Sequence, residues 1–350
     1  MTEILITGNT GYIGTVMTGF FRERGYRVRG LDSGWFKGKC FMPLDENQEP
    51  DVQILKDIRY VDGNDLKGVS AVIHLAGLSN DPMGELNSRL TDEINNKATV
   101  RLAKTCVKLG IDRFIFSSSC SMYGISGADR PVDEKSSLNP ITAYARAKVD
   151  AEKGLMALAG KKFHPVLMRN STVYGLSPRL RLDLVVNNLT AWAFVTGDVA
   201  IMSDGTPWRP NIHVEDLCGA FKAVLEAPAD KVGGQAFNVG RNTENYQVRA
   251  IARMVHEVLP GTRVRVLNKT GSDERTYRVD FTKFSAAFPE FKPVWTVKMG
   301  IKELAEAYGI YDLSKEDFES DKYFRIRSIR SLMSSGAMDE ELVIKGGNHD

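Results

Sequence analysis

The chain has 350 residues, of which 43% are hydrophobic and 26% are charged. This composition excludes a disordered chain, a collagen-like repeat and a small disulfide-stabilised protein, and the length predicts one large domain or two unequal ones. The 46 basic and 44 acidic residues leave a net charge of +2, so the charge does not indicate a nucleic-acid or membrane-surface partner.

The cysteines and the hydropathy pattern indicate in which cellular compartment we expect the protein. Cys40, Cys106, Cys120 and Cys218 are scattered without a C-x-x-C pair, which predicts reduced thiols and no metal site. No segment approaches the about 18 uninterrupted apolar residues of a membrane helix. The N-terminus lacks the basic and apolar regions of a signal peptide. We therefore expect a cytoplasmic protein without a membrane or nucleic-acid partner.

Strands and helices alternate in the first half of the chain. Strands are predicted at residues 3–7, 26–31, 69–75 and 113–117. A helix is predicted to end near Gly25, and a longer one spans residues 91–109, with Gly110 as its stop signal. This alternation is typical of βαβ units, so the fold class is α/β with a doubly wound parallel sheet of the Rossmann type.

The second half mixes further elements with turn-rich segments. Strands are predicted at 165–168 and 237–239, and helices at 184–196 and 299–308. The pattern predicts a smaller α/β domain built from C-terminal excursions of the chain. The expected division is a dinucleotide domain at 1–176 plus about 211–240, a substrate domain at about 177–210 and 241–311, and a surface extension at 312–350.

Within the extension, residues 324–329 alternate basic and apolar side chains. Arg325, Arg327 and Arg330 could bind phosphate, but a solvated face of an amphipathic helix is the simpler interpretation.

A glycine-rich turn follows the first predicted strand. Gly8, Gly11 and Gly14 allow a tight turn, a close approach of the backbone to a pyrophosphate, and close packing of the next helix, whose N-terminus attracts phosphate. Asp32 stands at the end of the second strand, where a carboxylate can hold a ribose 2′-hydroxyl. The pattern predicts a dinucleotide site, with NAD favoured over NADP because Asp32 repels a 2′-phosphate. Residues 33–51 are expected to form a flap near the adenosine.

Two further motifs carry candidate catalytic groups. Tyr144 and Lys148 are four residues apart and therefore share one helix face. A nearby cation and a cationic nicotinamide favour the phenolate, so Tyr144 can act as a general base. Ser119 lies in a serine run at the end of the fourth strand, on the carboxyl edge of the sheet where ligands bind.

Taken together, the glycine turn, Asp32, the serine run and the Y-x-x-x-K motif resemble an extended short-chain dehydrogenase/reductase. Within that superfamily the chain resembles the nucleotide-sugar epimerase/dehydratase group, from residue 3 to about residue 308. The resemblance implies NAD as cofactor, a nucleotide-diphosphate sugar as substrate and a homodimer packed through helices at 91–109 and 144–157. It implies catalysis by Ser119, Tyr144 and Lys148.

The resemblance also implies two sets of binding residues. The cofactor would be held by Gly8, Gly11, Tyr12, Ile13, Gly14, Asp32, Asp57, Ile58, Leu75, Ala76, Gly77, Asn95, Tyr144 and Lys148. The substrate would be held by Ser79, Ser119, Ser121, Thr172, Asn188, Leu189, Arg209 and Arg275. Thr172 stands where the family usually has asparagine. Arg209 would clamp the diphosphate, and the segment Asp273–Arg275 would supply a second clamp.

The two residues after Ser119 reduce the number of reactions of this group that the chain is expected to catalyse. Sugar 4,6-dehydratases of the group carry Asp-Glu there, whereas this chain has Cys120 and Ser121. The decarboxylases usually have glutamate, and the 3,5-epimerases cysteine, where Ser121 stands. What remains is oxidation of a sugar hydroxyl, with or without return of the hydride, and of these we expect the version with return, 4-epimerisation through a keto intermediate. The alternatives are net oxidation or reduction of a nucleotide sugar, a dehydratase, and a non-catalytic dinucleotide-binding protein.

Overall fold

The fold is organised around one parallel sheet of seven strands. The computed structural model describes residues 2–126, 130–268 and 275–345. In spatial order the strands are β11 (Gln235–Val239), β7 (His164–Asn170), β5 (Arg113–Ser119), β4 (Ala71–His74), β1 (Glu3–Thr7), β2 (Arg27–Asp32) and β3 (Val52–Leu55). The order reverses between β1 and β4, which is the switch point of a doubly wound sheet. The predicted fold class is confirmed.

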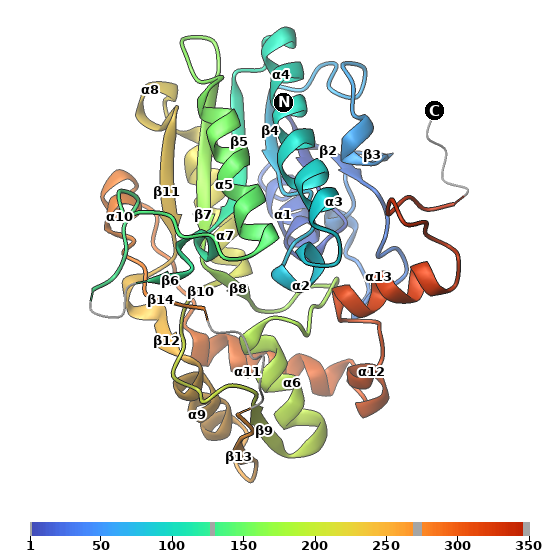
Figure 1. Ribbon diagram of the computed structural model, residues 1–350, viewed down its shortest axis with the longest axis vertical. Coiled ribbons are helices and arrows are strands. Elements are labelled where there is room, and N and C mark those ends of the chain that lie inside the picture. Colours follow the sequence, from blue (N-terminus) through green and yellow to red (C-terminus); the bar gives the residue numbers. More distant parts are fainter. Residues whose placement is uncertain (1, 127–129, 269–274, 346–350) are drawn as a thin grey trace.

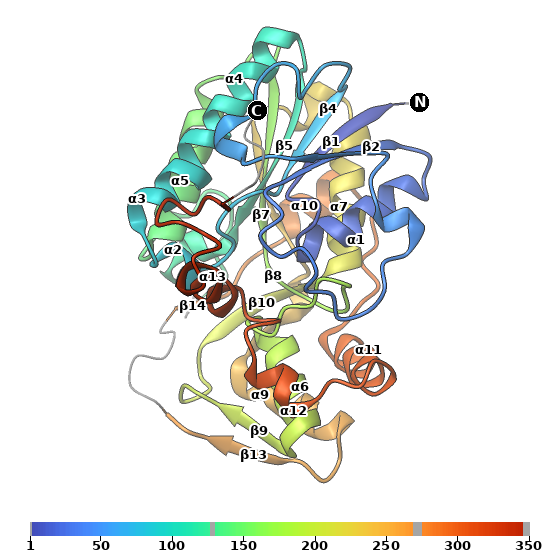
Figure 2. The ribbon, with the colours of Figure 1, turned by 90° about the vertical axis from the view of Figure 1, so that its right-hand side faces the viewer.

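Helices cover both faces of this sheet (Figures 1 and 2). The helices α1 (Tyr12–Arg22), α7 (Val214–Glu226) and α10 (Thr282–Ala287) lie on one face, and α3 (Ser88–Asp92), α4 (Ala98–Leu109) and α5 (Ala143–Met156) lie on the other. In β1, Ile4 and Ile6 enter one hydrophobic cluster and Leu5 enters the other. The two clusters follow from the alternation of side chains along a strand that is buried on both faces.

The helix predicted over 91–109 is interrupted. A single π-helical turn at Glu93–Lys97 separates α3 from α4, and it contains Asn95. The predicted stop at Gly110 is confirmed, because this glycine adopts a left-handed φ of 73° at the end of α4. Such π-turns are often found at functional sites.

A smaller region lies below the large sheet in Figure 1. Its helices are α6 (Val185–Thr196), α9 (Val248–Val258) and α11 (Val297–Ile310). Its strands are β8 (Thr172–Tyr174), β9 (Asp198–Ile201), β10 (Trp208–His213), β12 (Asn245–Gln247) and β13 (Arg263–Val266). The three helices pack in a third hydrophobic cluster that includes Val186, Ile251 and Ile301 and to which β9 contributes Val199 and Ile201. Further short elements are β6 (Ile125–Ser126), β14 (Thr276–Tyr277), α2 (Asp81–Gly84) and α8 (Ala229–Val232).

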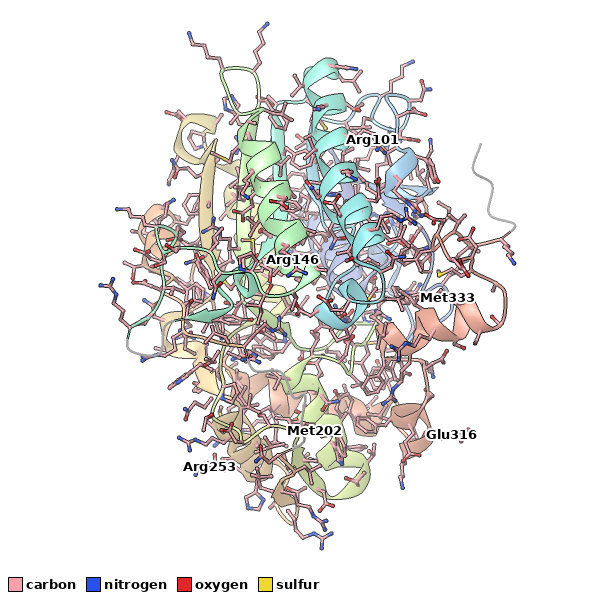
Figure 3. All side chains as sticks on the ribbon, in the orientation of Figure 1. Arg101, Arg146, Met202, Arg253, Glu316 and Met333 are labelled. Carbon is pink, nitrogen blue, oxygen red and sulfur yellow. The ribbon has the colours of Figure 1, made fainter. Side chains whose placement is uncertain are left out.

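The C-terminal residues 313–345, predicted as a surface extension, contribute buried side chains to the hydrophobic clusters. Glu316 on α12 (Lys315–Glu319) and Met333 on α13 (Arg325–Ser334) mark their two helices in Figure 3. Leu313 and Phe318 join the cluster of the smaller region, whereas Ile329, Met338 and Leu342 join a cluster of the large sheet. The residues from 313 to 345 therefore bridge the two regions.

The prediction of a solvated helix face is wrong for one of the three arginines. Arg325 is only 2% exposed, whereas Arg327 and Arg330 are exposed. Periodicity alone did not identify this burial, because a basic residue on an amphipathic helix is usually solvated. The division of the chain into the three domains predicted above remains a prediction.

Among the described helices, none combines the length and the apolar character that a membrane crossing requires.

Candidate active site

A cavity of about 940 Å³ opens at the carboxyl ends of the parallel strands. Residues at or directly after five strand ends line it: Gly8, Asp32, Leu75, Ser119 and Asn170. Its opposite wall comes from α6, β9 and β10 of the smaller region. The cavity therefore occupies the position where open α/β sheets bind their ligands, and its size suits a nucleotide ligand.

The glycine turn fits a dinucleotide phosphate. Gly8 has a φ of 75°, and a Cβ there would lie 2.8 Å from the backbone nitrogen of Ala76. A Cβ on Gly14 would lie only 2.1 Å from the carbonyl oxygen of Gly8, so no other residue fits in this first turn of α1. Gly11, Tyr12 and Ile13 line the cavity beside the helix N-terminus. Its N–H groups and its dipole favour a phosphate at this position.

Asp32 is held at the end of β2 by the backbone. Its carboxylate accepts hydrogen bonds from the N–H groups of Gly34 at 2.8 Å and Thr10 at 3.3 Å. Burial raises the pKa of Asp32, and these hydrogen bonds together with the charge of Arg179 oppose the rise. Asp57 and Ile58 also line the cavity, and Asp57 forms an ion pair of 2.6 Å with Arg59.

We predict that the protein binds NAD at least about 100-fold more tightly than NADP, because like charges placed together cost several kcal/mol and 1.4 kcal/mol is a tenfold change. Isothermal titration calorimetry with both ligands measures the ratio. Replacing Asp32 with asparagine keeps a ribose contact but removes the charge, so the ratio should shrink at least tenfold. Equal affinities in the unmodified protein would contradict the assignment of Asp32.

The segment after β4 forms another side of the cavity. Leu75, Ala76, Gly77 and Ser79 line it. Asn95 stands behind this segment: its side chain accepts from the N–H of Leu78 at 2.7 Å and donates to the carbonyl of Leu78 at 2.9 Å. Asn95 is 1% exposed and does not line the cavity, so any effect on the cofactor acts through the backbone that it holds.

The three predicted catalytic side chains converge on one wall of the cavity. Ser119 ends β5, and Tyr144 and Lys148 lie one turn apart on α5. The Lys148 ammonium donates to the carbonyl oxygen of Ser117 at 2.7 Å and lies 5.9 Å from the centre of the Tyr144 ring. The Ser119 hydroxyl donates to the Ser121 hydroxyl at 2.9 Å. The folded chain thus places all three groups on the wall of one cavity, with Tyr144 and Lys148 one turn apart as their spacing predicted.

Burial is the largest influence on the pKa values of Tyr144 and Lys148. It raises the pKa of Tyr144 to about 12, Asp81 raises it further, and a hydrogen bond with Ser119 and the charge of Arg181 oppose the rise. Burial lowers the pKa of the Lys148 ammonium to about 7, with Glu152 opposing the change. The sequence predicted Lys148 as the cation near Tyr144. Arg181 is a further cation whose charge lowers the pKa of Tyr144, and spacing along α5 could not identify it.

The predicted substrate residues all line the same cavity: Ser79, Ser119, Ser121, Thr172, Asn188, Leu189, Arg209 and Arg275. The Asn188 amide donates to the carbonyl of Leu182 at 2.7 Å. Arg275 forms an ion pair with Asp81, and Arg209 donates to the carbonyl oxygens of Trp208 and Arg275. The other two residues of the predicted second clamp, Asp273 and Glu274, lie outside the described residues.

Sequence reasoning missed several cavity residues. The Arg181 guanidinium donates to Asp183 at 2.8 Å and to the Ser79 hydroxyl at 3.1 Å, and Asn80 donates to Asp183 at 2.7 Å. The alternation Arg179-x-Arg181-x-Asp183 is the one sequence signal for this group. Trp35 and Phe36 line the cavity as well, and so does Arg325, one of the three arginines that the sequence indicated could bind phosphate. Trp35 and Phe36 belong to the segment that was predicted as a flap near the adenosine.

Comparison with known proteins places this site in a family. The model of the NAD-dependent epimerase/dehydratase family matches residues 4–240. The chain is 25% identical over 341 residues to a UDP-glucose 4-epimerase of Bacillus subtilis, covering 86% of this chain and 94% of the relative. It is 28% identical over 275 residues to the UDP-glucose 4-epimerase of Mus musculus, covering 69% and 78% of the two chains.

Solved structures give the same picture. The structure of MoeE5 in complex with UDP-glucuronic acid and NAD has a TM-score of 0.76 and 26% identity, covering 88% of this chain and 99% of its own. The structure of TunA, an NAD-dependent NDP-hexosamine 5,6-dehydratase, has a TM-score of 0.78 at 23% identity, which supports the fold alone. Because the family model matches more than half of the chain, the protein belongs to the NAD-dependent epimerase/dehydratase family and is an enzyme whose cofactor is NAD.

Proposed function

We propose that the protein is a nucleotide-sugar 4-epimerase, which inverts a ring hydroxyl through a keto intermediate. The relatives named as UDP-glucose 4-epimerases support this reaction, and the MoeE5 complexes with UDP-glucuronic acid and with UDP-glucose support the substrate class. The arginines Arg209 and Arg275 in the substrate half of the cavity suit a diphosphate, because guanidinium groups pair well with phosphate oxygens.

The observation that carries the proposal is the set of groups around Ser119. Cys120 is 1% exposed, its thiol contacts the carbonyl oxygen of Arg169, and burial raises the pKa of this thiol far above its usual range. Ser121 hydrogen-bonds Ser119. Neither residue offers the second acid and base that loss of water requires. The cavity carboxylates nearby, Asp81 and Asp183, are held in ion pairs with arginines.

The side chains that remain can move one proton to and from a sugar hydroxyl. The Ser119 hydroxyl orients the reacting hydroxyl, and the Tyr144 oxygen removes its proton. NAD, when bound, supplies the acceptor for the hydride that leaves the same carbon, and the hydride returns to that carbon afterwards. When it is protonated, Lys148 places positive charge beside the Tyr144 ring, and this charge favours the phenolate. Inversion would require the keto sugar to turn in the cavity, so that the hydride would be added to the opposite face of the same carbon. Tyr144 would then return its proton to the oxygen, with no net oxidation.

Isotope retention tests this proposal. UDP-glucose deuterated at the reacting carbon is incubated with the enzyme and catalytic NAD, and the products are analysed by mass spectrometry and NMR. We expect an epimerised product that keeps the deuterium, because the hydride leaves and returns within one active site. Label transferred stoichiometrically to free NADH, with an oxidised sugar as product, would contradict the epimerase and establish a net dehydrogenase. The same experiment with UDP-glucuronic acid shows which of the two sugar nucleotides the enzyme epimerises faster.

We also propose a homodimer, packed through α4 and α5 as the family resemblance implies. On α4, Val107 is 39% exposed, but Cys106 is fully buried and belongs to the core. Only the exposed part of that face is therefore available to a second copy. Light scattering of the purified protein gives its mass in solution.

A further inference from the structure

The C-terminal segment forms part of the cavity wall. Phe318, Glu319, Phe324, Arg325 and Arg327 line the cavity. Figures 1 and 2 show α12 beside the smaller region and α13 beside α2 of the larger one, so the segment crosses the junction at the cavity. The backbone N–H of Leu182 donates to the carbonyl of Tyr323 at 2.9 Å, and Lys39 forms an ion pair of 2.9 Å with Asp321. The segment is thereby tied to both sides of the site.

Arg325 is a buried cation without a carboxylate partner in the described chain. It is 2% exposed, and its guanidinium lies over the Phe36 ring at 4.2 Å. One terminal nitrogen, Nη2, donates to the carbonyl of Arg179 at 2.9 Å, whereas the other, Nη1, is buried with no hydrogen-bond partner. Burying a cation in this way is costly unless an anion compensates for it.

The charges around Arg325 leave an excess of positive charge. Burial, Arg181 and Arg179 lower the pKa of Arg325 to about 9, whereas Asp183 and Asp32 oppose the change. Asp183 is already paired with Arg181. Arg179 is 7% exposed, and its Nε is also buried without a partner. Three arginines therefore face two carboxylates, of which one is engaged and the other, Asp32, lies at the proposed ribose position.

Hydrogen bonds connect Arg325 to the glycine turn. The carbonyl that accepts from Arg325 belongs to Arg179, whose N–H donates to the Ser177 hydroxyl at 3.1 Å. That hydroxyl donates to the carbonyl of Tyr12 at 2.8 Å, in the first turn of α1. Three hydrogen bonds thus link Arg325 to the first turn of α1, whose N-terminus fits the dinucleotide phosphates, and the charge of Asp32 also acts on Arg325.

We propose that Arg325, supplied by the C-terminal segment, is a binding residue for the diphosphate of NAD and neutralises part of its charge. The shared chemistry is a nucleotide diphosphate. The hydrogen bond to Arg179 and the nearby charge of Asp32 favour the dinucleotide over the sugar nucleotide. The inference rests on the NAD site and not on the reaction, so it is tested by binding rather than by turnover.

The experiment compares Arg325→Gln with the unmodified full-length protein by isothermal titration calorimetry. Glutamine removes the charge but keeps a donor for the carbonyl of Arg179. If the Arg325→Gln variant is unfolded at the temperature of the assay, the Arg325→Met variant is used in its place. The ligands are NAD, ADP, adenosine and UDP. NAD and ADP affinities should each fall about 10- to 100-fold, the range expected for a lost hydrogen-bonded charge. Adenosine and UDP affinities should stay within about twofold of the unmodified protein's, far below a tenfold change.

Two control variants separate charge from structure. Arg325→Lys keeps the charge and should retain most of the NAD affinity. Arg330→Met removes an exposed arginine from the same helix, outside the cavity lining, and should leave all four affinities unchanged.

Three outcomes would overturn the inference. An equal loss for adenosine and for ADP would show that Arg325 only supports the wall near Phe36. A loss confined to UDP would assign the cation to the sugar nucleotide. Unchanged NAD binding in Arg325→Gln would remove any role in cofactor binding. None of these outcomes depends on the epimerase assay, so a failure of the proposed function and a failure of this inference are distinguishable.

Discussion

Replacing Tyr144 with phenylalanine should lower the turnover number by about 10²- to 10⁴-fold, the usual contribution of a positioned general base. The substitution removes only the hydroxyl, while the ring keeps its place on α5 beside Lys148 and Ser119. The fold and the NAD site should therefore persist. Steady-state kinetics with a UDP-sugar and calorimetry with NAD measure the two effects separately.

The reason for the large effect lies in the site itself. Burial raises the pKa of Tyr144 to about 12, so the phenolate forms only where positive charge is brought to it. The carboxylate close by, Asp81, is engaged because it is paired with Arg275.

A matched control is Tyr26→Phe. The Tyr26 hydroxyl donates to Glu226 at 2.7 Å and does not line the cavity, so its removal should leave turnover unchanged. Full activity in Tyr144→Phe would overturn the catalytic assignment. Equal loss in both variants would mean that the phenylalanine substitution acts through the fold.

Replacing Arg169 with methionine should lower the free energy of unfolding by about 3–5 kcal/mol, the cost of breaking a buried ion pair from one side. Arg169 at the end of β7 and Glu152 on α5 lie 2.7 Å apart, and both are buried. A second guanidinium nitrogen also reaches the same carboxylate. Although burial by itself lowers the pKa of Arg169, the hydrogen bonds and charge of Glu152 raise it above its usual value.

Without Arg169, the one hydrogen bond that the described residues still give the buried Glu152 carboxylate is that of 2.6 Å from Ser118. Glu152 follows Lys148 by one helical turn, so the pair also fastens the catalytic face of α5 to the sheet. Urea unfolding followed by circular dichroism measures the change. Lys153→Met provides the control, because its exposed pair with Asp150 should contribute less than about 1 kcal/mol.

A double variant separates the ion pair from the packing. Adding Glu152→Gln to Arg169→Met removes the uncompensated charge, so the double variant should be less destabilised than the sum of the two single variants. A strictly additive result would show that the two side chains stabilise the fold independently. If Arg169→Met lowered the free energy of unfolding by less than about 1 kcal/mol, the buried pair would contribute no more than an exposed ion pair does.

The catalytic and cofactor motifs were predictable from sequence because their geometry is local. The residues of the glycine turn lie within one strand-to-helix connection, and a spacing of four places Tyr144 and Lys148 on one helix face. Strand β1 was predicted with its observed bounds, since a short apolar run before a glycine turn is typical of a buried parallel strand. The roles of the individual site residues remain predictions.

Other elements could not be predicted from local pattern. Strand β3 was missed because its residues alternate between half-buried and exposed at the edge of the sheet, with no apolar run to mark them. The π-turn that contains Asn95 was expected as continuous helix, because its sequence is compatible with both forms.

What the sequence by itself determined is therefore the fold class, the NAD motif and the catalytic spacing, all of which depend on residues near one another along the chain. Only the tertiary structure brought Phe36, Arg179 and Arg325 together, across separations of more than one hundred residues. The physical reason is that burial of an arginine is decided by which distant surfaces pack around it. The sequence around Arg325 indicated only a basic amphipathic helix, whereas packing of the whole chain places the Arg325 guanidinium in the wall of the cavity.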